Sequence, residues 1–108
     1  MVEERFKKAK ETIEKEVENF GLKLEKILLF GSRAKGNYKK DSDWDFLIVV
    51  NKDLSGREKR KLSANIRLKL IFQNMPSDVI IVSNKTFNER KKDVGHIIYY
   101  SIKDGIVL

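Results

Sequence analysis

The chain of 108 residues contains no cysteine and only one histidine. The absence of cysteine excludes a disulfide scaffold, a thiol nucleophile and a cysteine-type zinc site, and a single histidine excludes a multi-histidine metal site. Long apolar runs are missing as well: the longest, Phe46–Val50, has the length of a strand and not the ~20 residues of a membrane span. The N-terminus is charged from Glu3 onward and offers no secretory signal. These absences favour a cytoplasmic protein without a membrane segment.

The composition predicts one small globular domain, residues 1–108. Hydrophobic residues make up 41% of the sequence, which suffices for a core and is too much for a disordered protein. The net charge is +7. Clustered basic residues either form solvated helix faces or attract phosphates and acidic partners. The sequence shows no nucleic-acid-binding motif and no interleaving of basic and aromatic residues, so binding of nucleic acid is not expected.

Hydrophobic periodicity and capping signals predict helices that alternate with a few short strands. Apolar residues at spacings of three and four from Phe6 to Phe20 predict a first helix, which Gly21 ends. Ser55 and Glu58 form a capping box that begins a later helix. This alternation predicts an α+β fold in which a small mixed β-sheet of three to four strands is covered by helices. The expected helices are Val2–Phe20, a short helix within the loop Gly31–Asp43, Ser55–Phe72 and Lys85–Lys103, and the expected strands are Leu24–Phe30, Asp45–Val50, Asp78–Val82 and Ile106–Leu108.

Asp43 and Asp45 are the first candidate site residues. Strand side chains alternate, so residues two apart point to the same face, with their backbones roughly 6.5–7 Å apart. Two carboxylates this close repel each other unless a cation neutralises them, and Mg²⁺ commonly takes one or two carboxylates together with substrate phosphates. The pair lies where a polar loop meets the most apolar strand. The alternative is a structural turn capped by Asp41, Ser42 and Asp43.

Gly31 and Ser32 directly follow the first expected strand and form the second candidate. Glycine lets a phosphate approach the backbone, amides at the start of a helix bind anions, and the Ser32 hydroxyl can add a hydrogen bond. Gly36 completes a G-x-x-x-x-G pattern, but Asn37-Tyr38 stands where a P-loop requires Lys and Ser or Thr, which excludes a P-loop. An ordinary glycine turn is the alternative interpretation.

Asp78 is the third candidate, at the start of the expected strand Asp78–Val82. A helical crossover connects this strand to the strand of Asp45, which should make the two strands parallel and adjacent. A third carboxylate there could share a metal ion and accept the proton of an attacking hydroxyl group. A residue in a helix-to-strand turn is the alternative. A phosphate-binding turn beside metal-binding carboxylates is what nucleotidyl transfer needs, because such chemistry depends on positioning and on neutralisation of charge.

The segments Leu29–Gly36 and Ser42–Val49 resemble the minimal nucleotidyltransferase (MNT) family of the DNA polymerase β-like superfamily. The family signature is Gly-Ser and, after a spacer like the ten residues here, Asp-x-Asp, which this chain matches. The segment Asp78–Val82 resembles the strand that carries the family's third carboxylate, and residues 98–108 resemble its last helix and end. The resemblance covers most of the chain and implies a polymerase β-like nucleotidyltransferase fold.

The resemblance also implies roles for the matching positions. Gly31 and Ser32 would hold the triphosphate of ATP. Asp43 and Asp45 would bind two Mg²⁺ ions, and Asp78 would be the third metal ligand and the general base. The three aspartates are thus the expected catalytic and metal-binding residues.

The same resemblance extends to two basic residues and to a partner protein. Arg33 and Lys35 match positions that are commonly basic in the family and that either contact phosphates or lie on the surface; Arg33 is included among the expected nucleotide-binding residues. Many such chains resemble antitoxins paired with a HEPN-type toxin, a helical RNase whose tyrosine the antitoxin adenylylates. The implied partners are therefore ATP or another NTP and a HEPN-type helical protein, in a homo- or hetero-oligomer.

The leading hypothesis is an active transferase that moves AMP from ATP to a hydroxyl group of a protein or small molecule. One alternative is an inactive subunit that neutralises or scaffolds a helical partner protein, and another is one half of a small-molecule nucleotidyltransferase. The complete set of Asp43, Asp45 and Asp78 favours the active enzyme. Recognition of the acceptor is expected to involve another chain, because 108 residues provide a nucleotide half-site and little else.

The other conspicuous side chains are expected to be structural. Trp44 should point away from the two aspartates that flank it, because alternate residues of a strand face opposite sides. His96 is expected to pack on the last helix, and Tyr99 and Tyr100 to lie at a helix face or interface rather than against a nucleotide base.

Overall fold

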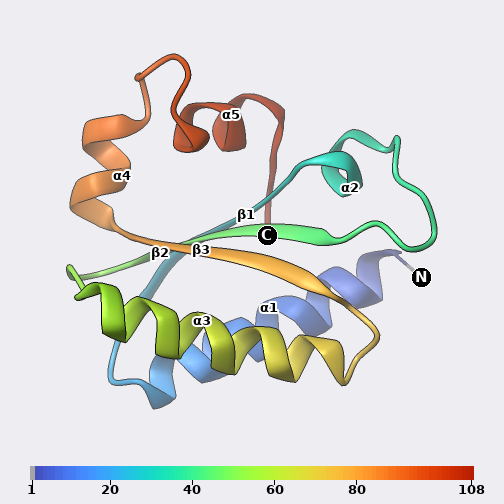
Figure 1. Ribbon diagram of the computed structural model, residues 1–108, viewed down its shortest axis with the longest axis horizontal. Coiled ribbons are helices and arrows are strands. Elements are labelled where there is room, and N and C mark those ends of the chain that lie inside the picture. Colours follow the sequence, from blue (N-terminus) through green and yellow to red (C-terminus); the bar gives the residue numbers. More distant parts are fainter. Residues whose placement is uncertain (1) are drawn as a thin grey trace.

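A four-stranded mixed β-sheet forms the centre of the molecule and carries helices on both faces (Figure 1). The computed structural model describes the backbone of residues 2–108 and the side chains of residues 4–108. The predicted α+β class is confirmed. No helix of these residues is long and apolar enough to span a membrane. The helices are α1 (Val2–Asn19), α2 (Ser32–Lys35), α3 (Gly56–Ile71), α4 (Asn84–Arg90) and α5 (Ile97–Asp104), and the strands are β1 (Leu24–Phe30), β2 (Trp44–Val50), β3 (Ser77–Ser83) and β4 (Ile106–Val107).

The strand order is β3-β2-β1-β4. β1 is antiparallel to both of its neighbours, whereas β2 and β3 are parallel because α3 forms the crossover between them. The parallel neighbour predicted from the sequence is therefore present, with Asp45 of β2 paired to Asp78 of β3. The predicted strand at the end of the chain is also present, shortened to two residues that pair with β1. In this arrangement, β2 and β3 begin beside the C-terminal end of β1.

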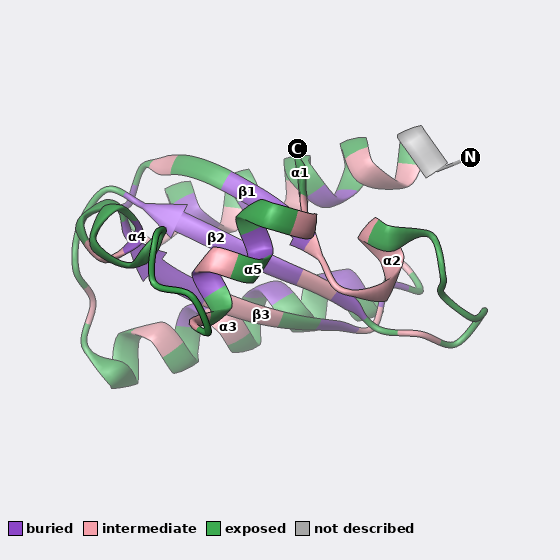
Figure 2. Cartoon of the chain, turned by 90° about the horizontal axis from the view of Figure 1, so that it is seen from above, coloured by how far each residue is buried: buried purple, intermediate pink, exposed green. Residues whose placement is uncertain are grey.

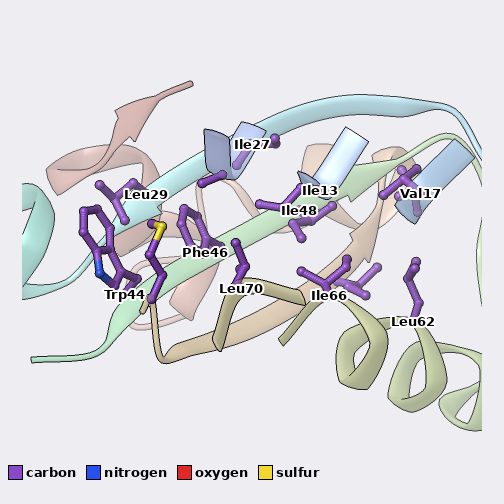
Figure 3. Close-up of a cluster of buried hydrophobic side chains, with 14 of the residues drawn as sticks. Ile13, Val17, Ile27, Leu29, Trp44, Phe46, Ile48, Leu62, Ile66 and Leu70 are labelled. Carbon is purple, nitrogen blue, oxygen red and sulfur yellow. The ribbon is translucent and has the colours of Figure 1, made fainter. Parts of the chain in front are cut away.

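Two hydrophobic clusters cover the two faces of the sheet. The larger one, drawn in Figure 3, lies between the sheet and helices α1 and α3, and the smaller one lies between the sheet and helices α4 and α5 (Figure 1). β2 contributes to both, because Phe46 and Ile48 face the larger cluster while Leu47 and Val49 face the smaller one. Figure 2 shows β2 as a buried strand in the middle of the sheet. Burial on both faces explains its continuous apolar sequence.

Helices α1 and α3 begin and pack as the sequence predicts. The Ser55 hydroxyl accepts a hydrogen bond from the Glu58 backbone N–H at 3.1 Å, and the Glu58 carboxylate accepts one from the Ser55 N–H at 3.0 Å. These two bonds complete the capping box of α3. The side chains that α1 and α3 bury recur every four residues, which is the spacing of one helix face. They are Ala9, Ile13 and Val17 in α1, and Leu62, Ile66 and Leu70 in α3.

The single helix expected over Lys85–Lys103 is wrong, because the structure has two helices there, α4 and α5. Gly95 between them adopts a φ of +97°, which glycine tolerates and a continuing right-handed helix excludes. His96 then caps α5, its Nδ1 accepting a hydrogen bond from the Ile98 N–H at 3.1 Å. The apolar spacing of the sequence continues across this break, so periodicity alone joined two separate helices.

Candidate active site

Three segments of the chain meet at one end of the sheet, where β1 ends and β2 and β3 begin (Figure 1). Asp45 is the second residue of β2 and pairs in register with Asp78, the second residue of β3. On the side of Asp45 away from Asp78, its partner is Phe30, the last residue of β1. Gly31 and Ser32 directly follow Phe30 and therefore lie beside Asp45. Paired residues of neighbouring strands share a face of the sheet, which places the side chains of Asp45 and Asp78 side by side.

Asp43 lies two residues before Asp45, directly ahead of β2. Asp43 and Asp78 are exposed and line the same hollow, and Asp45 is half-buried. The residue between the two aspartates, Trp44, points into the larger cluster (Figure 3). It is 3% exposed, and its ring stacks on Phe46 with centroids 6.4 Å apart. The predicted orientation of Trp44 is therefore confirmed.

The three carboxylates make a strongly negative site. Burial raises the pKa of Asp45 above its ordinary value, and the negative charges of Asp78 and then Asp43 raise that pKa further. None of the ion pairs formed by residues 4–108 involves any of these three carboxylates. Crowded carboxylates without an ion-paired cation suit a divalent metal, which prefers oxygen ligands. No group of three or more His, Cys, Asp or Glu side chains among the described residues could hold a metal ion by itself.

Gly31 packs directly against the Asp45 carboxylate. Its φ of +75° and ψ of −159° lie in a region that is essentially restricted to glycine. A Cβ atom at this position would overlap Oδ2 of Asp45 and would lie 3.1 Å from its Cγ. The turn after β1 therefore needs glycine for two reasons, its backbone conformation and its closeness to the carboxylate.

Ser32 begins the single turn of α2 next to this glycine. The backbone N–H groups of Ala34 and Lys35 both donate to the Gly31 carbonyl, at 3.1 and 3.2 Å. The Ser32 hydroxyl is half-buried, and none of the side-chain hydrogen bonds within residues 4–108 engages it. This hydroxyl is therefore available to a molecule bound beside the carboxylates.

Arg33 holds the loop that connects α2 to β2. Its Nε and Nη2 atoms donate to the Ser42 carbonyl at 3.2 and 2.9 Å, and Nη2 also donates to the Lys40 carbonyl at 3.1 Å. Its Cζ atom lies 4.4 Å from the ring centroid of Tyr38 and 4.7 Å from that of Trp44. The sequence did not reveal these contacts. They fix the end of the loop directly ahead of Asp43.

Other residues that the sequence singled out lie around the site rather than in it. Nζ of Lys35 forms an ion pair with Oδ2 of Asp104 at 3.7 Å, which links α2 to the end of α5. The rings of Tyr99 and Tyr100 pack edge to face against each other with centroids 5.4 Å apart. The two tyrosines thus lie at a helix face, as expected.

The carboxylates border a hollow that the sequence analysis missed. It has a volume of about 440 Å³ and lies between the C-terminal half of α3 and the start of β3. The sequence contains one indication of this hollow: α3 carries apolar residues, Leu68 and Ile71, outside the face that it buries. The lining is largely aliphatic, from Ala64, Leu68, Ile71 and Pro76, and its charged members are Asp43, Arg67 and Asp78.

Comparison with known protein families identifies the class of this chain. Residues 7–105 match the family model of the nucleotidyltransferase domain. Because the match covers nearly the whole chain, the chain belongs to this family, as its resemblance to minimal nucleotidyltransferases predicted. It carries a nucleotidyltransferase domain.

One curated relative gives a more specific comparison than the family model. A relative from Methanocaldococcus jannaschii, "Putative protein adenylyltransferase MJ0141", is 42% identical over 57 residues, which are 53% of this chain and 52% of the relative. The chain thus spans about half the length of the curated relative that it matches.

Two solved structures have the same fold. A toxin–antitoxin crystallised with AMP-PNP has a TM-score of 0.60 and 18% identity, over 90% of this chain and 69% of that one. A double aspartate-to-glutamate mutant of the toxin–antitoxin MntA-HpeT has a TM-score of 0.55 and 19% identity, over 86% of this chain and 66% of that one. At these identities, the likeness establishes the fold alone.

Arg33→Lys is expected to loosen the loop ahead of β2. Lysine keeps the charge but lacks the planar fork that makes two bonds to the Ser42 carbonyl. One hydrogen bond to a charged group is worth about 1.5–3 kcal/mol, so local opening of the loop should become about tenfold or more favourable. Trypsin cleavage after Lys39 or Lys40 under native conditions measures this opening and should accelerate accordingly.

Lys35→Gln is the matched control, because it removes a nearby basic side chain that contacts α5 and not the loop. Its cleavage in the loop should match that of the wild type. Unchanged cleavage of Arg33→Lys combined with about tenfold weaker ATP binding would instead show that the Arg33 guanidinium contacts a phosphate directly.

Proposed function

We propose that this nucleotidyltransferase moves AMP from ATP to a hydroxyl group of a partner protein in a Mg²⁺-dependent reaction. The observation that carries the proposal is the meeting of Asp43, Asp45 and Asp78 with the Gly31-Ser32 turn at one end of the sheet. The relative named as a protein adenylyltransferase supports a protein acceptor, and the related fold crystallised with AMP-PNP supports an adenine nucleotide.

Gly31 and Ser32 are proposed to hold the triphosphate. Gly31 gives the turn a backbone conformation that places Ser32 beside the carboxylates, and the unengaged Ser32 hydroxyl can donate a hydrogen bond to a phosphate oxygen. Arg33, which the sequence placed with these residues, is proposed to support the site chiefly through the loop that it holds.

Asp43, Asp45 and Asp78 are proposed to bind Mg²⁺, with two ions as the family resemblance implies. Their mutual repulsion, which contributes to the raised pKa of Asp45, fits a site that a cation would stabilise. Bound Mg²⁺ would neutralise charge on the phosphates and on the departing pyrophosphate. Phosphate oxygens and water would complete the coordination, as Mg²⁺ sites commonly require.

Asp78 is proposed to accept the proton of the acceptor hydroxyl group. This residue is exposed near the start of the end strand and lines the hollow beside α3, from which an acceptor can approach. The hydroxyl oxygen forms a bond to the α-phosphorus, and the bond from that phosphorus to the oxygen bridging the β-phosphate breaks. Pyrophosphate leaves, and the proton of the hydroxyl passes to Asp78.

The acceptor is proposed to be a helical partner protein of the HEPN type, with this domain as the antitoxin of the pair. The toxin–antitoxin structures that share the fold support a toxin as the partner, and the family resemblance implies the HEPN type. The site itself supports a separate acceptor chain, because the hollow beside Asp78 is bordered by exposed apolar side chains of α3.

ATP is expected to bind measurably only with Mg²⁺ or Mn²⁺, because its phosphates would otherwise meet three carboxylates. Calorimetry with metal and with EDTA tests this, and affinity should fall at least about tenfold in EDTA. Label from the α-phosphate of ATP, and not from the γ-phosphate, should then appear on a protein acceptor. Equal binding in EDTA would contradict the metal assignment, and binding without any transfer would favour an inactive binding subunit.

A further inference from the structure

Helix α3 carries most of the net positive charge of the chain. Its 16 residues include six basic side chains and one acidic side chain, so the helix holds five of the seven net positive charges. The acidic residue, Glu58, already accepts the backbone hydrogen bond of the capping box. The surplus positive charge of α3 is therefore available to an acidic partner.

One side of α3 borders the free edge of the sheet. β3 is an end strand, so among the described residues no further strand pairs with its outer side. Figure 2 shows β3 at this edge with part of α3 visible beyond it. Two hollows of about 440 and 450 Å³ lie next to each other between α3 and β3, since Arg67 lines both, and we call them together the α3–β3 groove. This α3–β3 groove is lined by Arg60, Ser63, Arg67, Leu68 and Ile71 of α3 and by residues 77–81 of β3.

The α3–β3 groove changes character along its length. Lys59 and Arg60 line the part that is distant from the carboxylates. The part beside Asp78 is lined by Leu68 and Ile71, which are 56% and 54% exposed. A ligand lying in the groove would therefore meet positive charge at one end and, at the other, apolar surface beside the carboxylates of Asp43 and Asp78.

We propose that the α3–β3 groove binds an extended acidic segment of the acceptor protein and brings its hydroxyl group to Asp78. This inference rests on the proposed function, because it uses Asp78 as the group that takes up the proton. Carboxylates of the segment pair with Arg60 and Arg67, and an apolar or aromatic side chain packs against Leu68 and Ile71. The groove is thus the acceptor half of a site whose nucleotide half is the turn after β1.

A polypeptide fits this lining better than a nucleic acid does. Phosphates would also be attracted by the charge of α3, but single-stranded nucleic acids bind through aromatic side chains that stack on the bases. Neither hollow is lined by an aromatic residue of the described chain. Exposed aliphatic side chains beside cations match a segment that mixes acidic and apolar residues.

A random copolymer of glutamate and tyrosine is a suitable probe, because it presents carboxylates, aromatic rings and hydroxyl groups in one extended chain. Fluorescence anisotropy at an ionic strength of about 0.15 M, where the Debye length is about 8 Å, should detect its binding to the full chain, and a copolymer of lysine and tyrosine should not bind. Combining Arg60→Glu with Arg67→Glu should weaken binding of the acidic copolymer by about tenfold or more.

The matched control is Lys61→Glu combined with Lys69→Glu. Both lysines are exposed on α3 and line neither hollow, and the pair changes the net charge by the same amount. Because surface charges outside the groove are screened by solvent and salt, this pair should change the affinity by less than about twofold.

Equal losses in the two variants would overturn the proposal, because charge alone would then explain binding. Tighter binding of poly(U) RNA than of the acidic copolymer, also lost with the two groove arginines, would overturn it in favour of a nucleic acid. Calorimetry of wild-type protein with ATP and Mg²⁺ runs in parallel: failure there would refute the proposed function, while the copolymer measurements still decide whether the groove binds an acidic chain.

Discussion

Asp45→Asn is expected to abolish nucleotidyl transfer and to leave the protein at least as stable as the wild type. The carboxylate lies between Gly31 and Asp78 at the point where the three site segments meet. Charge stabilisation by a bound metal ion is worth several kcal/mol, so losing a ligand worth about 4 kcal/mol lowers the rate about a thousandfold. Incorporation of α-phosphate label from ATP into the glutamate–tyrosine copolymer measures the effect.

The expected stability follows from the pKa of Asp45. Because burial and the neighbouring carboxylates raise that pKa in the folded protein, the fold binds the proton of Asp45 more tightly than the unfolded chain does. At a pH above the pKa of Asp45 in the folded protein, the ionised carboxylate therefore lowers the free energy of unfolding. This destabilisation disappears as the pH falls toward the ordinary pKa of an aspartate. Asparagine removes this destabilisation at neutral pH, so the Tm without metal should stay equal to that of the wild type or rise.

Asp41→Asn is the matched control for this variant. Asp41 is exposed in the loop ahead of β2 and shares the chemistry of the substitution without belonging to the group of three carboxylates. Its transfer rate and Tm should equal those of the wild type. Full transfer by Asp45→Asn, or a Tm far below that of the wild type, would mean that the carboxylate is structural and that the proposed chemistry is wrong.

Gly31→Ala is expected to lower both the transfer rate and the Tm. Alanine at φ +75° and ψ −159° is strained by about 1–3 kcal/mol, which lowers the Tm of a domain of this size by about 4 °C or more. Its Cβ atom would also overlap Oδ2 of Asp45, so the carboxylate must rotate away. Displacing a catalytic group by about 1 Å costs about a hundredfold in rate.

Gly21→Ala separates these two effects. Gly21 has a φ of +81°, but a Cβ atom there would meet no other atom within 4 Å. The control should therefore lose stability through backbone strain while transfer, measured well below its Tm, stays at the wild-type rate. If Gly31→Ala transferred as fast as Gly21→Ala, the contact between Gly31 and Asp45 would have no catalytic importance.

The sequence predicted most of the fold because its local signals agree with the tertiary structure. The capping box at Ser55 and Glu58 begins α3, and the most apolar strand, β2, lies inside the sheet, where both of its faces are buried. The helical crossover correctly predicted a parallel β3. The exception is the break at Gly95, where a glycine conformation interrupts an apolar spacing that suits either one helix or two.

Less of the site could be predicted, because part of it depends on contacts between distant elements. Strand alternation and topology predicted that Asp45 and Asp78 lie at one end of the sheet, and the register confirms this placement. The contacts of Arg33 with the loop depend on where a long side chain happens to reach, and no local pattern encodes that. The α3–β3 groove arises only when the helix packs beside the end strand.

The pairing of Asp45 with Asp78 sets the distance between the backbones that carry two of the site's carboxylates. Neighbouring strands of a sheet are about 4.7–4.9 Å apart, close to the separation of about 3.5–4 Å between paired metal ions in enzymes of this chemistry. Hydrogen bonds of the β2–β3 ladder fix the backbones of Asp45 and Asp78, and the contacts of Arg33 hold the loop end ahead of Asp43. A cation at the proposed site would therefore meet carboxylates on a fixed base, and a larger ion such as Ca²⁺, with bonds of about 2.3–2.6 Å instead of about 2.0–2.1 Å, would have to be accommodated by side-chain rotation alone.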